Sequence, residues 1–163
     1  LIDTRDDATD RTLRPGRALR VPVTGIAGVP DDGTAVGVAL NVTAVGTAGP
    51  GWLRVWPCDD DEPDTSSVNY TAAGAIEPNA VVVPVGASGE VCVSTLTRTE
   101  VIVDVSGWFD AGLRVGSGRL LDTRDDDTRR TLRPGAALRV PVTGRAGVPA
   151  RALEVPRGRP PAG

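Results

Sequence analysis

The chain of 163 residues contains no histidine. This absence removes the commonest general base, the usual metal ligand and every Ser–His or Cys–His nucleophile pair. Its two cysteines, Cys58 and Cys92, are too few for a zinc site built from four thiolates. We therefore expect a protein that has no catalytic residues, is not an enzyme and uses no cofactor.

Lysine is also absent, so all 18 basic residues are arginine, and the formal net charge is −3. A chain with no excess of positive charge lacks the field that attracts nucleic acid or an anionic membrane. No apolar run approaches the length that is needed to span a bilayer. Nucleic acid and membrane insertion are therefore not expected for this chain.

Aromatic residues make up only 3% of the chain, and the hydrophobic residues are mostly Val, Ala and Leu. Val packs well on a pleated surface because its side chain branches at Cβ. The 20 Gly and 14 Pro residues interrupt the sequence at short intervals, which disfavours long helices. This composition predicts an all-β fold of short strands joined by turns.

Apolar and polar residues alternate in several short stretches, with the period of a half-buried strand. Pro22 and its counterpart Pro141 lack an N–H group, which places their strands at a sheet edge or a bulge. About eight strands at this spacing predict a β-sandwich of jelly-roll or immunoglobulin-like type over residues 1–110. The predicted strands are Leu1–Arg5, Ala18–Thr24, Val36–Val45, Trp52–Cys58, Val68–Ala72, Ala80–Val85, Glu90–Thr95 and Glu100–Phe109.

The opening of the chain occurs twice. Residues 1–30 match residues 120–149 at 25 of 30 positions. The match ends at Pro149, and the Arg-, Pro- and Gly-rich residues that follow have no strand pattern. We interpret residues 111–118 as a linker, 119–149 as a partial second repeat and 150–163 as a disordered tail.

The second repeat duplicates only the first two strands, and an isolated hairpin is marginally stable in water. Residues 119–143 therefore need a host sheet. They could donate strands to a neighbouring copy head to tail, as in a ring or filament, or pair beside its strands, or fold back on their own module. The alternative is a truncated tandem module. The predicted assembly residues are Leu120, Leu121, Asp122, Leu138, Val140 and Val142.

Cys58 and Cys92 lie in strand-like contexts, RVWPC and GEVCV. A disulfide between them would stabilise the fold by about 3–4 kcal/mol, because it closes a loop in the unfolded chain. It would also imply an oxidising, extracytoplasmic compartment. Two buried free thiols are the alternative interpretation.

Trp52, Arg54 and Trp56 share one face of a predicted strand. Exposed aromatic side chains in a row can stack on sugar rings, so these three residues form a candidate ligand face for a polysaccharide. The alternative is that the indoles cover a core edge or a subunit interface.

Two groups of carboxylates suggest further roles. Asp59, Asp61 and Asp64 are weak calcium candidates, because their loop lacks the spacing and central glycine of an EF-hand. A solvated acidic loop is the plainer interpretation.

Asp104 interrupts an apolar strand, where a buried carboxylate must be paired. We predict Arg5 as its partner in a structural ion pair.

Eight short motifs occur in a fixed order: LIDTR (which returns as LLDTR at residues 120–124), GVP, LNVTAV, VWPC, SSVNY, PNAVVVPVG, GEVCV and VIVDVSGWF. In this order the chain resembles a repeated β-rich module of secreted and cell-surface proteins of actinobacteria. The resemblance covers residues 1–110 and restarts at Arg119. It implies an extracellular or cell-surface location, tandem neighbouring modules and no catalytic role.

Together these observations predict a non-enzymatic structural or assembly module of the cell surface, which associates with itself or with tandem neighbours. The alternative is a carbohydrate- or surface-binding module of a larger secreted protein.

Overall fold

The computed structural model describes residues 2–6, 11–110, 120–124, 132–145 and 148–150. The chain divides into two compact units, Leu1–Leu113 and Arg114–Gly163. The predicted linker, residues 111–118, lies outside the described residues, and so does the predicted tail beyond Ala150.

The first unit is all-β, with no helix among its described residues. Seven of the eight strands agree with the predicted ones to within about two residues at each end, whereas β6 begins at Ile76 and not at Ala80. β6 is a sheet edge, and there its Pro78 is tolerated. The strands are β1 (Ile2–Asp3), β2 (Leu19–Pro22), β3 (Gly37–Val45), β4 (Gly51–Pro57), β5 (Val68–Tyr70), β6 (Ile76–Pro84), β7 (Glu90–Thr95) and β8 (Glu100–Phe109).

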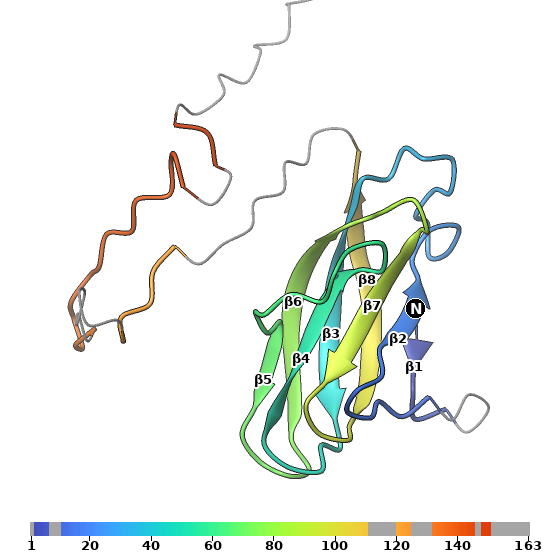
Figure 1. Cartoon of the computed structure of the whole chain (residues 1–163), viewed down its shortest axis with the longest axis horizontal. Helices are drawn as coiled ribbons and strands as arrows, with labels where there is room; N and C mark the ends of the chain where they lie inside the picture. The colour runs from blue at the N-terminus through green and yellow to red at the C-terminus, as the bar shows by residue number, and fades with distance from the viewer. Residues whose placement is uncertain (1, 7–10, 111–119, 125–131, 146–147, 151–163) are drawn as a thin grey trace, which may run out of the picture. The chain divides into compact units, whose positions relative to one another are not determined.

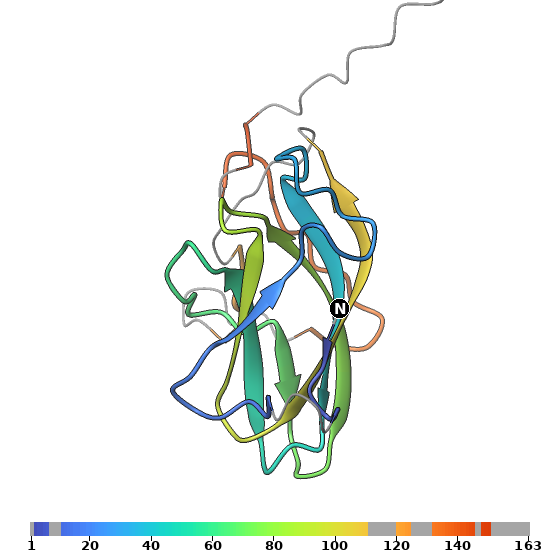
Figure 2. The same ribbon diagram turned by 90° about the vertical axis from the view of Figure 1, so that its right-hand side faces the viewer.

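The strands form two antiparallel sheets, in the orders β1-β8-β3-β6 and β2-β7-β4-β5. Figure 2 shows the sheets as two layers of a sandwich. The first strand pairs with the eighth, the second with the seventh, the third with the sixth and the fourth with the fifth. This pairing, wrapped into two sheets, is jelly-roll topology, one of the two sandwich types that the sequence predicted.

The hydrophobic core lies between the two sheets and is built from alternate residues of the strands. On β3, Val38, Leu40 and Val42 are at most 1% exposed, and on β7, Val91 and Val93 are completely buried. Each Val or Leu buried in this way stabilises the fold by about 1.5–3 kcal/mol relative to an exposed side chain. The alternation seen in the sequence is therefore the alternation between core and outer face.

Residues 1–30, which we call the first segment, supply one edge strand to each sheet. β1 lies beside β8 and β2 lies beside β7, at one margin of the sandwich (Figure 1). Pro22, predicted at an edge, is the last residue of edge strand β2. We call residues 31–110 the body. Since β1 and β2 are both edge strands, the first segment can leave without interrupting either sheet.

Candidate functional site

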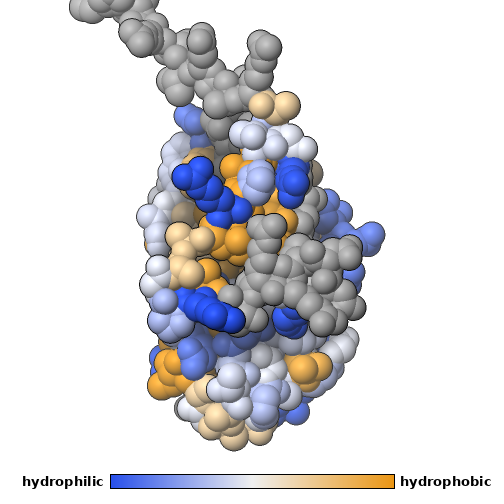
Figure 3. Space-filling model, turned by 90° about the vertical axis from the view of Figure 1, so that its left-hand side faces the viewer, coloured by the Kyte–Doolittle hydropathy of each residue, from blue (hydrophilic) through white to orange (hydrophobic). Residues whose placement is uncertain are grey.

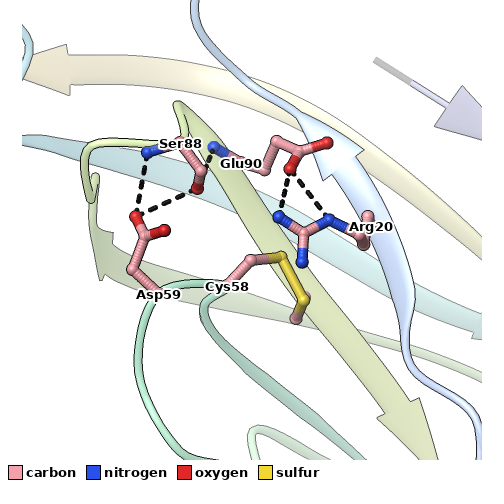
Figure 4. The surroundings of a disulfide bond; sticks show 6 residues. Arg20, Cys58, Asp59, Ser88 and Glu90 are labelled. Atoms are coloured by element: carbon pink, nitrogen blue, oxygen red, sulfur yellow. Dashed lines mark hydrogen bonds and ion pairs between the residues drawn. A yellow bond between two sulfur atoms is a disulfide. The ribbon is translucent and has the colours of Figure 1, made fainter.

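Cys58 and Cys92 form a disulfide, as predicted, with their Cα atoms 4.9 Å apart. Cys92 lies between Val91 and Val93, which point into the core, so its side chain is on the outer face of β7. Figure 4 shows the bond close to Arg20 and Glu90. The disulfide fastens the start of the acidic loop, residues 58–67, to β7.

The acidic loop is also tied to the outer face by its polar groups. Ser94 Oγ donates a hydrogen bond of 2.6 Å to Glu62 Oε1. The Arg54 guanidinium donates to the same oxygen at 3.0 Å and to the carbonyl oxygen of Asp64 at 3.2 Å. The hydrogen bond from Ser94, with the ion pair to Arg54, lowers the pKa of Glu62. The loop is therefore anchored at both β4 and β7.

The predicted ligand face differs from an open row of aromatic side chains. Trp56 is only 7% exposed, so it is a buried structural residue. Arg54 Cζ lies 4.1 Å from the centroid of the Trp52 ring, a cation–π contact within the chain. One indole is thus buried and the other is already covered by a guanidinium.

The three calcium candidates do not gather into a site. Asp59 accepts hydrogen bonds from the Ser88 backbone N and Oγ, at 2.9 and 3.0 Å, and these lower the pKa of Asp59 (Figure 4). Asp61 and Asp64 are exposed. Within the described part of the chain, no three His, Cys, Asp or Glu side chains are placed to hold a metal ion. The described residues also include no helix long and apolar enough to cross a membrane.

Arg5 pairs with Asp3 rather than with Asp104. Its Nε donates to Asp3 Oδ1 at 2.9 Å, and the side-chain hydrogen bonds from Arg5 lower the pKa of Asp3 to about 2. Asp104 is exposed on β8, opposite Asn41 of β3. The correction has a simple cause: alternate residues of this apolar strand face water, and Asp104 is one of them.

Two glutamates of the body hold the first segment, and sequence patterns did not single them out. Glu100 accepts hydrogen bonds from Thr4 Oγ1 at 2.6 Å and Thr12 Oγ1 at 2.7 Å. Glu90 accepts one from Arg20 Nε at 2.9 Å (Figure 4). No local signal marks these glutamates, because their partners lie 70 to 96 residues away in the sequence.

Backbone pairing and burial complete the contact between the first segment and the body. Ile2 lies opposite Val103 in the β1–β8 pair, and Val21 lies opposite Val91 in the β2–β7 pair. An isolated bridge joins Leu13 to Thr99. Among the described residues of the first segment, four apolar side chains are only 0–2% exposed: Leu13, Val21, Val23 and Val29.

Residues 120–149, which we call the copy, contain no strand among their described residues. The expected pair of strands is therefore not formed there. The reason is physical, since a strand exists only when it pairs with another strand. The predicted assembly residues that lie in this irregular backbone are Leu120, Leu121, Asp122, Leu138, Val140 and Val142.

The turns of the copy, in contrast, reproduce those of the first segment. Gly144 N donates to Val148 O at 2.9 Å, just as Gly25 N donates to Val29 O at 2.9 Å. Gly135 and its counterpart Gly16 have φ angles of 78° and 77°. Arg124 Nε donates to Asp122 Oδ1 at 2.8 Å, as Arg5 does to Asp3. The same sequence has thus folded locally in the same way.

Burial distinguishes the two segments. Leu132, Val140, Val142 and Val148 of the copy are 60, 38, 46 and 39% exposed. Their counterparts in the first segment are at most 2% exposed. Figure 3 shows hydrophobic side chains, in orange, beside hydrophilic ones, in blue, at the protein surface. The copy has the turns of an edge segment and, within the described residues, no strand partner to cover its apolar side chains.

The molecule thus offers two candidate sites, the outer face beneath the acidic loop and the apolar side chains of the copy. The first is occupied by the chain's own loop, and the second is open. No family model, curated protein or solved structure matches this chain.

Proposed function

We propose that this protein is a non-enzymatic extracellular structural module, and that residues 119–149 join it to a neighbouring jelly-roll module by supplying edge strands. One observation carries this proposal. Four apolar side chains that are 0–2% exposed in the first segment are 38–60% exposed in the copy, although the described turns are the same.

Two features support an extracellular location. The Cys58–Cys92 disulfide is a bond that persists in oxidising compartments. The order of the eight motifs resembles a repeated module of secreted and cell-surface proteins of actinobacteria. The two features overlap, because Cys58 and Cys92 lie within two of the eight motifs, VWPC and GEVCV.

The carboxylates with perturbed pKa values support a structural role. Hydrogen bonds within the chain lower the pKa of Asp3, Asp59 and Glu62. A general acid that works near neutral pH needs a carboxyl pKa raised toward that pH. These three groups are held in the charged form instead, as parts of turns and loop anchors.

The energetics of docking favour a segment of this kind. At an acceptor site that no first segment occupies, burial of Leu132, Val140, Val142 and Val148 would contribute at most about 1.5–3 kcal/mol for each side chain. Ordering of the backbone opposes docking. The entropy lost on ordering is smaller for the copy, because its described turns already have the conformation that the first segment has when it is bound to the body.

The number of segments decides when association takes place. The chain holds one body and two segments. When folded chains exchange segments, each body gives up one segment and binds another, so the number of contacts between segments and bodies does not change. Chains that refold together can associate, because each body then meets both the first segment and the copy before its own first segment has paired with it. Continued transfer from chain to chain builds a head-to-tail ring or filament.

The test uses the full chain, unfolded in guanidinium and refolded at high concentration. We expect dimers and larger species by size exclusion with light scattering. The Val140→Asp/Val142→Asp variant should remain monomeric, because its carboxylates would be buried on docking. The matched control is Ala136→Asp/Ala137→Asp, which adds the same charges at exposed positions and should associate as the wild type does. A monomeric wild type, or equal association of the Val140→Asp/Val142→Asp variant, would contradict the proposal.

A further inference from the structure

We propose that the acceptor is a second copy of this chain, and that residues 120–149 dock where its residues 1–30 now lie, on β7 and β8. This inference rests on the proposed function and adds the partner and the docking site. The first segment and the copy are then interchangeable occupants of one site on the body.

The side chains that hydrogen-bond to the body are the same in both segments. In the first segment they donate to two body carboxylates, Glu90 and Glu100. The copy brings the same two hydroxyls and the same guanidinium to these carboxylates. The retained pairs are Thr4/Thr123, Thr12/Thr131 and Arg20/Arg139.

The apolar contact face is retained as well. Each apolar side chain that the first segment buries at 2% exposed or less has an identical counterpart in the copy. The proline that ends edge strand β2 is also repeated, as Pro141. The retained apolar pairs are Leu13/Leu132, Val21/Val140, Val23/Val142 and Val29/Val148.

The three differences that fall on described residues of the first segment spare this contact face. Arg17 and Ile26 are exposed in the first segment, and they become Ala136 and Arg145. Ile2, partly buried against the core, becomes Leu, a residue of the same size. The remaining two differences, at positions 8 and 10, lie outside the described residues. The described changes therefore fall on the surface or keep the volume of the side chain.

The topology allows one segment to replace the other. β1 ends one sheet and β2 ends the other, so their departure leaves β8 and β7 as new edges. A segment from another chain can then pair with these edges from outside, without passing through either sheet. This is the geometry of strand exchange between identical modules.

Disulfide trapping tests the docking site. Asp3 lies opposite Ile102 in the β1–β8 register, so Asp122 of the incoming copy should lie there instead. Opposed residues of antiparallel strands have Cα atoms about 4.5–5.5 Å apart, which a disulfide can bridge. Full chains that carry Asp122→Cys and Ile102→Cys, refolded at high concentration and oxidised, should give crosslinked dimers and larger species on a non-reducing gel. Peptide mapping should locate the new bond between positions 122 and 102.

Two control variants make the trapping result interpretable. Asp3→Cys/Ile102→Cys should crosslink within single chains, which verifies the register. Asp122→Cys/Val82→Cys places the second thiol on β6, at the opposite edge of the same sheet, and should not crosslink. If the copy crosslinks to position 82 instead, the proposed docking site is wrong. If it crosslinks to position 102 only within single chains, the proposed partner is wrong. Association by itself would then still support the proposed function, whereas chains that never associate contradict both proposals.

Complementation tests whether the two segments are interchangeable. Val21→Asp/Val23→Asp disables the first segment, so the full chain keeps one usable segment for each body. We expect this variant to keep a cooperative urea transition and to form oligomers, because the copy takes the vacant site. Addition of Val140→Asp/Val142→Asp should abolish the transition or lower its midpoint sharply. An equal loss of the transition in both variants would overturn the interchangeability of the segments.

Discussion

Removal of the Cys58–Cys92 disulfide gives a stability change that can be worked out from the structure. The two cysteines are 34 residues apart. A closed loop of this length lowers the entropy of the unfolded chain by about 12–13 cal/mol/K, which corresponds to about 4 kcal/mol at 25 °C. We therefore expect the free energy of unfolding to fall by about 4 kcal/mol when the bond is reduced or replaced in Cys58→Ala/Cys92→Ala.

The native state should change little when this bond is lost. The acidic loop keeps its hydrogen bonds from Ser94 and Arg54 to Glu62, so it should remain on the outer face. The effect then lies mainly in the unfolded chain, where the entropic account places it. Native tryptophan emission should therefore be the same with and without the disulfide, whereas the urea midpoint should fall.

Urea unfolding followed by tryptophan fluorescence measures both quantities in one experiment. Thermal unfolding gives an independent value, since a domain of this size shifts its midpoint by roughly 4 °C per kcal/mol, or about 15 °C in total. The reduced wild type and the Cys58→Ala/Cys92→Ala variant should agree. A stability loss below about 1 kcal/mol would refute the entropic argument. A red shift of the native emission would show that loss of the bond exposes tryptophan in the folded state, so that the effect is not confined to the unfolded chain.

Two further predictions concern buried or anchoring polar groups. The hydrogen bond from Ser94 and the ion pair with Arg54 lower the pKa of Glu62, so its contribution to stability is present above pH 4.5 and is lost as the pH falls below that value. Urea unfolding of Glu62→Gln should therefore depend less on pH across this window, and a pH dependence equal to that of the wild type would argue against the anchor. Tyr70→Phe removes a buried hydroxyl that lies 2.8 Å from Thr95 Oγ1, and should cost about 1–3 kcal/mol of unfolding free energy. An unchanged urea midpoint would show that this hydroxyl contributes nothing to stability.

The strands were predictable because their alternation follows from burial on one face. The prediction placed β7 at Glu90–Thr95 and β8 at Glu100–Phe109, with the bounds that the structure shows. The start of β6 was missed, because Pro78 and the exposed residues around it carry no period of two. Strand order was not predictable, since it depends on pairings between residues that are far apart in the sequence.

Some of the residues that hold the structure together were likewise predictable from the sequence, and others were not. The disulfide was predictable from two cysteines in strand-like contexts. Glu90 and Glu100 were not, because nothing near them in the sequence marks the threonines and the arginine that they bind. Burial of Trp56 was also not predictable, because strand alternation places this side chain on the outer face, which the sequence pattern marks as exposed.

The duplicated stretch LRVP shows most directly what each level of structure decides. At residues 19–22 it forms β2, and at residues 138–141 the same four residues form no strand. The turns around both stretches are alike, because their hydrogen bonds close within a few residues and the sequence alone determines them. A strand instead needs hydrogen bonds and apolar cover from a partner, and only the tertiary structure supplies these, through β7. The sequence therefore determined that the segment would occur twice with the same turns, and the tertiary structure decided that only one of the two has a sheet.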